Sequence, residues 1–533
     1  MVRSKMTLRA AAAAALLLVT ACGGGDGSGG AGGTIVVGMR SDFGGFNPIT
    51  SDALYSMELM NYALFTPLIQ YDENLQPRPW LAESWVEEGD TAVVFRLRTD
   101  VTWHDGQRVT AEDVKFTFDR ARLPESASLI GSAFLSNVES ATVIDSFTIR
   151  FDYARPHAQA LEDFWWAPAP KHLLEGIAPA DMRNAPYNRA PVGSGPFRLT
   201  AWEANRQLVI EPYEGFPESL GGPPAARRIV FRIIPEASTL LTELVTGGVH
   251  VDIPVMPDQV NQIQEGASTN LLSFPGRTVY FIGWNNERAP FDDARVRRAL
   301  ALALNRQEII DALLYGQGQI ATSTVPPWHP LYPDGVEPLP HDPEAAAALL
   351  EEAGWTDTNR DGIRDKGGQP LSFELLVSDD ALRRATAEVI QAQLRQVGAQ
   401  ANIRVTEFQT MLAAHRGRDF DAVFTNWVLD NFQVASAPNA LLHSSQADIA
   451  NSANRSSVRI PELDAVMERA AAASDPEVAR QAWAEFTRIL QREQPMTFMF
   501  WLNELAGVRD ELSGVEMDPR GEFQTIRDWT LSR

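Results

Sequence analysis

Several short strings in the sequence contain residue types that could form a catalytic site. The Gly-Ser-Gly string at 193–195 is similar to the turn that exposes a nucleophilic serine, but G-x-S-x-G needs glycine where this chain has Val192 and Pro196. The eight histidines form no HExxH zinc motif, and His104 precedes an Asp-Gly turn. Neither a phosphate-binding GxxxxGKS/T loop nor a GxGxxG helix start is present. No motif therefore supports an enzyme, although a pair of catalytic acids would leave no such string.

One segment, Asp357–Asp365, has the oxygen-rich spacing that begins a calcium-binding loop. The loop pattern requires a bidentate glutamate six residues after its glycine, and this chain has Gly368 there. Because the strongest ligand is missing, we expect a polar hairpin turn and no bound metal, with calcium as the alternative.

Charge and cysteine content exclude other classes of protein. The 533 residues carry 69 acidic and 46 basic side chains, a formal net charge of -23, and a single cysteine. One cysteine excludes a disulfide scaffold and a Cys-rich zinc site. Nucleic-acid binding normally requires a basic face, and a chain this acidic argues against one. We therefore expect no nucleic-acid partner. The length and the 44% hydrophobic content suit a globular protein of two to four domains.

The first 33 residues have the layout of an export signal and a tether. A basic start precedes a ten-residue apolar run, and the string VTAC at 19–22 resembles the bacterial lipobox, in which cleavage leaves a lipid-bearing cysteine at the new N-terminus. We therefore predict a lipoprotein signal peptide at 1–21 and lipidation of Cys22, with an ordinary secretory signal as the alternative. Eight of the eleven residues from Gly23 to Gly33 are glycine, so residues 22–33 are predicted to be a flexible tether.

After Thr34 the sequence alternates predicted strands with capped helices. Alternating apolar residues predict a half-buried strand at 93–98, and Thr110 with Asp113 predicts a helix start. An apolar stripe that ends at Gly398 predicts a helix, followed by a strand at 402–405. This alternation predicts an α/β fold with mixed sheets.

Further helix signals lie in the second half of the chain. Asp342 and Pro343 form an N-cap followed by proline at the first helical position. We expect Arg295, Arg297 and Arg298 to form the exposed face of another helix.

Six strings together resemble the family 5 extracellular solute-binding proteins, which are the peptide, dipeptide and nickel receptors of bacterial ABC importers. They follow one another in family order and span most of the chain after residue 34. The strings are FRLR at 95–98, VTWHDG at 101–106, TAEDVKFTFDR at 110–120, VGSGPFRL at 192–199, FIGWNNERAPFDDARVRRALALALNR at 281–306 and AGWTDTNRDGIRD at 353–365.

The resemblance implies a type II periplasmic-binding-protein fold, in which two lobes with mixed sheets close on a ligand and an extra subdomain is inserted in lobe I. Hinge strands are expected near Trp284 and Phe500. The implied parts are lobe I at 34–70, 190–283 and 500–533, the inserted subdomain at 71–189, and lobe II at 284–499.

The resemblance also implies a ligand contact at Trp427 and Asp430. In peptide-binding members the aspartate of this segment pairs with the free α-amino group of the ligand, and a carboxylate about 4 Å from an ammonium contributes on the order of 4 kcal/mol at an effective dielectric of 20. Trp427 would form a flat apolar wall. The alternatives are an Asp430 that caps a loop or meets an arginine, and a Trp427 in the core. The residues at 431–434 depart from the acid and proline that often follow in peptide binders.

Four weaker candidates complete the implied ligand site. Asn285 and Asn286 lie where the family chain enters lobe II, and they either meet the ligand or fix the hinge. Phe43 and Asn47 lie where the rim of the cleft is expected.

These features predict a lipid-anchored substrate-binding protein that captures a small solute, above all an oligopeptide or dipeptide, and delivers it to an ABC permease in the inner membrane. We expect an exported monomer on the cell envelope, with no catalytic activity and no cofactor. Peptides, oligosaccharides and chelated nickel are all ligands within this family, so the ligand stays open. The alternatives are an exported hydrolase that uses two carboxylates and a solute sensor with the same binding fold.

Overall fold

The computed structural model describes residues 33–155, 160–429, 432–449 and 451–532. The predicted signal peptide, Cys22 and nearly all of the tether lie outside the described residues, and so does Asp430. Among the helices in these ranges, none combines the length and the apolar composition needed to cross a membrane.

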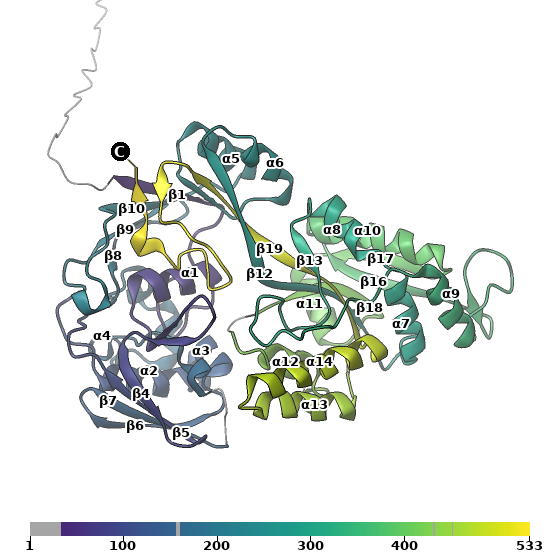
Figure 1. Cartoon of the computed structure of the whole chain (residues 1–533), viewed down its shortest axis with the longest axis horizontal. Helices are drawn as coiled ribbons and strands as arrows, with labels where there is room; N and C mark the ends of the chain where they lie inside the picture. Colours follow the sequence, from purple (N-terminus) through teal and green to yellow (C-terminus); the bar gives the residue numbers. More distant parts are fainter. Residues whose placement is uncertain (1–32, 156–159, 430–431, 450, 533) are drawn as a thin grey trace, which may run out of the picture. The chain divides into compact units, whose positions relative to one another are not determined.

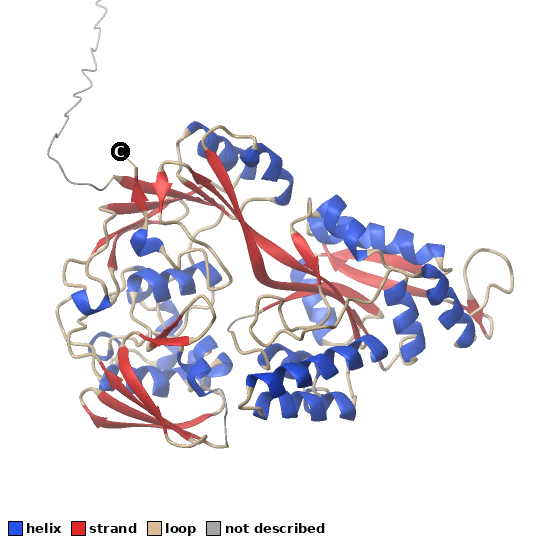
Figure 2. Cartoon of the chain, viewed as in Figure 1, coloured by secondary structure: helices blue, strands red, loops and turns tan. Residues whose placement is uncertain are grey.

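Most strands belong to one mixed sheet of eleven strands, shown as red arrows in Figure 2. The two longest strands, β12 and β19, pair antiparallel at its centre and run side by side in Figure 1. β1 is parallel to both of its neighbours, and so is β16, which makes the sheet mixed. In sheet order the strands are β17 (Gln400–Thr406), β16 (Ser372–Ser378), β18 (Ala422–Val428), β12 (Thr269–Trp284), β19 (Met496–Arg509), β11 (Val251–Ile253), β1 (Thr34–Met39), β10 (Arg228–Ile233), β9 (Gln207–Pro212) and β8 (Phe197–Glu203), with β13 (Gly318–Ile320) against β19.

A second, antiparallel sheet of four strands lies wholly within residues 71–189, the range predicted for the inserted subdomain. The predicted strand at 93–98 and the helix start at Thr110 are confirmed, because β5 spans Ala92–Leu97 and the carboxylate of Asp113 accepts the Thr110 backbone N–H. The division of the chain into lobe I, inserted subdomain and lobe II stays a prediction. The sheet order is β4 (Ala82–Glu87), β5, β7 (Thr148–Tyr153) and β6 (Val138–Asp145); three pairs of short strands are β2 (Ile69–Tyr71) with β3 (Pro77–Pro79), β14 (Asp365–Lys366) with β15 (Gln369–Pro370), and β20 (Leu512–Ser513) with β21 (Thr530–Leu531).

Helices cover both faces of the sheet at its β16–β18 end (Figure 2). The predicted caps are confirmed: the side chain of Asp342 accepts the backbone N–H of Ala345, and Gly398 has the positive φ that ends a helix. The α-helices are α1 (Leu54–Leu59), α2 (Ala111–Ala121), α3 (Leu129–Ala133), α4 (Lys171–Leu174), α5 (Ala237–Thr246), α6 (Val260–Gln264), α7 (Ala294–Leu302), α8 (Arg306–Leu313), α9 (Pro343–Glu352), α10 (Ala381–Gln396), α11 (Phe408–Arg416), α12 (Ser436–Leu442), α13 (Pro461–Ala472) and α14 (Pro476–Glu493).

One expectation for α7 is wrong. Arg297 is buried, and its guanidinium donates to the backbone carbonyls of Phe291, Glu493 and Gln494. These carbonyls lie at the C-terminal end of α14 and just before α7, so Arg297 joins the two helices. A guanidinium with several donors can satisfy carbonyls that a helix end leaves unpaired, which is why burial is tolerated here.

Candidate functional site

A cavity of about 310 Å³ collects residues from distant parts of the chain. α1 and the segment before it supply one wall, and the middle of β12 and the end of β18 supply another. In the predicted division these segments belong to lobe I, the inserted subdomain and lobe II, so all three parts meet here. The lining residues are Asp52, Leu54, Met57, Glu58, Leu129, Trp165, Arg277, Thr278, Val428 and Leu429.

The wall of the cavity contains a buried ion pair. Nη2 of Arg277 lies 2.6 Å from Oε1 of Glu58, and the two side chains are only 8% and 1% exposed. Arg277 lies in β12 where its register with β19 is interrupted, between Pro275 and Thr278. The carbonyl of Arg277 accepts the backbone N–H of Leu429 at 3.0 Å. The bulged strand therefore positions the guanidinium and also holds the end of β18.

Two more carboxylates lie beside this pair. Arg277, Glu504 and Glu522 line a small adjoining cavity of about 20 Å³, and Oε2 of Glu58 accepts the backbone N–H of Glu522 at 3.0 Å. Burial, and secondly the charge of Glu522, raises the pKa of Glu58 well above its usual range and the pKa of Glu504 to about 7. Three carboxyl groups thus lie near one guanidinium, which forms an ion pair with Glu58; a cationic group of a ligand would favour the ionised form of a further carboxyl.

The two residues that follow Trp427 in the sequence line this cavity, and Trp427 itself does not. Val428 and Leu429 line the cavity, whereas Trp427 is half-buried and packs against the core formed with α12–α14. Successive side chains of a strand point to opposite faces, which separates Trp427 from Val428. The role of Trp427 as a ligand wall stays a prediction, and Asp430 follows Leu429 directly in the sequence.

Asn285 and Asn286 are engaged with the backbone where β12 ends. Nδ2 of Asn285 donates to the carbonyl of Phe420 at 3.0 Å, and its side chain is buried. Nδ2 of Asn286 donates to the carbonyls of Ser456, at 2.7 Å, and Pro495, at 3.1 Å. These bonds join β12 to the segments around it, which is the hinge-fixing alternative; a ligand contact stays a prediction.

Phe43 and Asn47 also make contacts within the chain. Phe43 is buried, with its ring centroid 5.3 Å from the rings of both Phe46 and Phe231. Asn47 is fully buried, and its Nδ2 donates to Oδ1 of Asn188 at 2.9 Å. Neither residue lines the 310 Å³ cavity, and their role as ligand contacts stays a prediction.

An aromatic cluster that the sequence did not indicate lies next to the cavity. Phe432 is buried, with its ring centroid 4.9 Å from Trp165, 5.1 Å from Tyr71 and 6.2 Å from Trp328. Beside it, the side-chain amide of Gln433 donates to Oδ1 of Asp163. Phe432 belongs to predicted lobe II but packs in a core whose other buried residues belong to predicted lobe I and the inserted subdomain.

The Gly-Ser-Gly string and the calcium-like loop have structural roles. Ser194 is fully buried and its Oγ accepts the backbone N–H of Thr66, while a Cβ on Gly193 would lie 1.8 Å from the Leu64 carbonyl oxygen. In the loop at 357–365 the acidic side chains accept N–H groups of the loop itself. No cluster of three or more His, Cys, Asp or Glu able to hold a metal is found among the residues the structure describes.

Comparisons with known proteins cover nearly the whole chain. A family model described as bacterial extracellular solute-binding proteins, family 5 Middle, matches residues 76–448. The oligopeptide-binding protein AppA of Bacillus subtilis is 28% identical over 513 residues, which cover 94% of this chain and 92% of AppA. The nickel-binding periplasmic protein of Escherichia coli is 30% identical over 394 residues, 72% of each chain. The solved structure of Bacillus subtilis AppA in complex with a nonapeptide has a TM-score of 0.77 and 27% identity, and covers 95% of this chain and 100% of that chain.

Proposed function

The chain belongs to the family 5 bacterial extracellular solute-binding proteins, and we propose from this premise that it captures a small solute in the 310 Å³ cavity and delivers it to an ABC permease. Family membership confirms the resemblance seen in the sequence and the α/β, two-lobed type II fold. In this function the chain binds its ligand and returns it unchanged, so no catalytic step and no cofactor is needed.

The proposed ligand is a peptide with a free amino terminus. The observation that carries this choice is the group of carboxyls at the cavity: Glu58 lines it and pairs with Arg277, and Glu504 and Glu522 line the small cavity that adjoins it. A buried ammonium needs a negative partner, because removing an unpaired charge from water is very unfavourable. One relative that matches along most of the chain, AppA, is an oligopeptide-binding protein, in agreement with this choice.

Asp430 is proposed to pair with the same ammonium, because it follows Leu429, which lines the cavity. In the variant Asp430→Asn, affinity for free-amino peptides should fall at least about tenfold, which corresponds to 1.4 kcal/mol. Affinity for the same peptides with an acetylated amino terminus should not change. Equal affinity of the unmodified protein for the free and acetylated forms would refute the pairing.

A metal chelate is the second candidate ligand, because the nickel-binding periplasmic protein of Escherichia coli is 30% identical. Melting temperatures measured with a panel of peptides, sugars and nickel chelates separate the two, since a ligand that binds only the folded state raises its stability. We expect stabilisation by peptides alone. Stabilisation by nickel chelates without any effect of peptides would replace the first candidate with the second.

Anchoring through a lipid on Cys22 completes the proposal. The glycine-rich residues 22–33 would tether the binding unit to the outer face of the cytoplasmic membrane or to the periplasmic envelope, where it meets the permease as a monomer. Metabolic labelling with a radioactive fatty acid should mark the full-length protein and should fail for Cys22→Ser. A labelled Cys22→Ser protein would exclude this anchor.

A further inference from the structure

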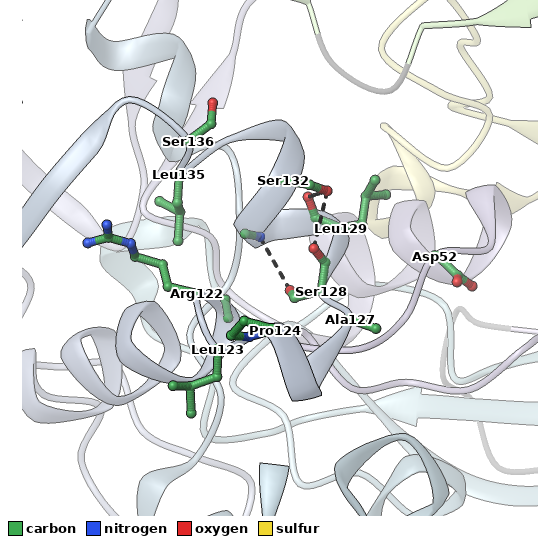
Figure 3. A pocket seen from close by; sticks show the side chains of 12 residues that line it. Asp52, Arg122, Leu123, Pro124, Ala127, Ser128, Leu129, Ser132, Leu135 and Ser136 are labelled. Atoms are coloured by element: carbon green, nitrogen blue, oxygen red, sulfur yellow. Dashed lines mark hydrogen bonds between the residues drawn. The ribbon is translucent and has the colours of Figure 1, made fainter. Parts of the chain in front are cut away.

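An open groove of about 520 Å³ lies beside the cavity, at the end of α2 and along α3 (Figure 3). Its floor is formed by the turn between these helices, and its walls are formed by both polar and apolar side chains. The lining residues are Asp52, Ala121, Arg122, Leu123, Pro124, Ala127, Ser128, Leu129, Gly131, Ser132, Leu135 and Ser136.

The groove and the cavity share two lining residues, Asp52 and Leu129. Asp52 is held at this junction by Arg183, whose Nη1 lies 3.0 Å from Oδ2 of Asp52 and whose Nη2 donates to the carbonyl of Ala127. Leu129 begins α3 and follows Ser128, whose Oγ accepts the backbone N–H of Gly131. The same two side chains thus border both spaces, so the groove and the cavity adjoin.

The volumes indicate a ligand larger than the cavity alone can hold. The cavity lies at the lower end of the range of about 300–1,000 Å³ that is usual for small-molecule sites. The groove adds a larger volume that stays open to solvent, where the variable end of a ligand can lie without losing its hydration.

Charge differs between the two spaces. Glu58 lines the cavity, and Glu504 and Glu522 line the small cavity that adjoins it, whereas the groove is lined by Arg122. Arg122 lies 5.1 Å from the ring centroid of Phe118 and donates one N–H to the carbonyl of Glu139. A guanidinium has five N–H donors, so the packed and anchored Arg122 keeps donors for a carboxylate. Figure 3 shows Arg122 and Asp52 on opposite sides of the view, with Ser128 and Leu129 between them.

We propose that the groove binds the C-terminal part of an extended peptide, which passes between Asp52 and Leu129 and turns its free carboxylate toward Arg122 while its ammonium lies in the cavity beside Glu58. This inference rests on the proposed function, and it adds the length and the direction of the ligand. Dipeptides fill the cavity alone, and longer peptides gain the contacts of the groove.

A peptide series from two to six residues, titrated calorimetrically into the full-length protein, tests the groove. We expect the hexapeptide to bind at least about tenfold more tightly than the dipeptide, which corresponds to about 1.4 kcal/mol of binding free energy. Ser132→Trp places a bulky ring in the groove from the exposed side of α3 and should remove this advantage while dipeptide binding is kept. The matched control is Ser238→Trp, on the exposed face of α5, which should retain the wild-type dependence on length.

A second variant tests the direction of the peptide. Arg122→Gln should weaken a hexapeptide with a free carboxylate about fivefold, as expected for a partly exposed charge pair, and leave its C-terminal amide unchanged. Equal affinities of wild type for dipeptide and hexapeptide, or a full length advantage in Ser132→Trp, would overturn the groove while the proposed function stands. A folded wild-type protein that binds no peptide of any length would instead overturn the proposed function, and the groove assignment with it.

Discussion

Replacing Arg277 with methionine should strongly destabilise the protein, and the loss should depend on pH. Methionine keeps much of the volume of the arginine stem but removes the guanidinium that pairs with Glu58 and whose charge also acts on Glu504. Removing one partner of a buried ion pair typically costs about 3–5 kcal/mol, because the other charge stays buried without a partner. With exposures of 8% and 1%, this pair is fully in that regime.

The sign of the pH dependence follows from the raised pKa of Glu58 and of Glu504. A carboxyl whose pKa is higher in the folded state contributes stability that is complete below its unfolded pKa of about 4.3 and is lost as the pH rises through the folded value. For Glu504 that folded value is about 7. Arg277→Met should therefore lose more stability at pH 8 than at pH 5, because Glu504 is ionised at the higher pH and protonated at the lower.

A double-mutant cycle measured by urea unfolding, followed by circular dichroism, tests this account. Glu58→Gln with Arg277→Met removes both charges and should recover at least half of the loss, since a buried pair replaced as a whole costs little. Arg295→Met, on the exposed side of α7, is the matched control and should keep the wild-type urea midpoint. A loss in Arg277→Met that is equal at pH 5 and pH 8, or as large in the double variant, would refute the reasoning.

Three further predictions concern residues outside this pair. Asp252 is buried and burial raises its pKa to about 7, so Asp252→Asn should be more stable than wild type by up to about 4 kcal/mol at pH 8 and by only about 1.5 kcal/mol at pH 5. A difference between variant and wild type that is the same at both pH values in thermal unfolding would contradict this. Asn285→Ala should lower the free energy of unfolding by about 1–3 kcal/mol, because two backbone carbonyls lose their donor. Its peptide affinity should equal that of wild type. A loss of affinity without a loss of stability would identify Asn285 as a ligand contact. Phe432→Ala removes the contacts of predicted lobe II with Trp165 and Tyr71 of the predicted inserted subdomain, so the ligand-free radius of gyration measured by small-angle scattering should increase. An unchanged radius would show that Phe432 does not hold lobe II against the inserted subdomain.

Local elements of the fold were predictable because their signals lie within a few residues. Thr110 with Asp113 marked the start of α2, and Gly398 marked the turn after α10, because capping and positive φ depend on neighbouring backbone groups. The burial of Arg297 was not predictable in this way. Its carbonyl partners include those of Glu493 and Gln494, and only the packing of α7 on the end of α14 brings them together.

The candidate site was predictable only in part, for the same reason. The resemblance located the segment around Trp427, and its neighbours Val428 and Leu429 do line the cavity. Glu58 and Arg277 are 219 residues apart, and nothing in the types of their sequence neighbours links them. Their contact depends on the bulge of β12 and on the position of α1, which are set by the whole sheet.

Mass spectrometry of the ligand that co-purifies with the protein tests the central claim most directly. The protein is isolated without added ligand and denatured, and the released small molecules are compared with those from Asp430→Asn prepared in the same way. We predict a mixture of intact peptides with free amino termini, reduced in the variant. Sugars or nickel chelates in place of peptides, or peptides that are equally abundant in the variant, would contradict the account.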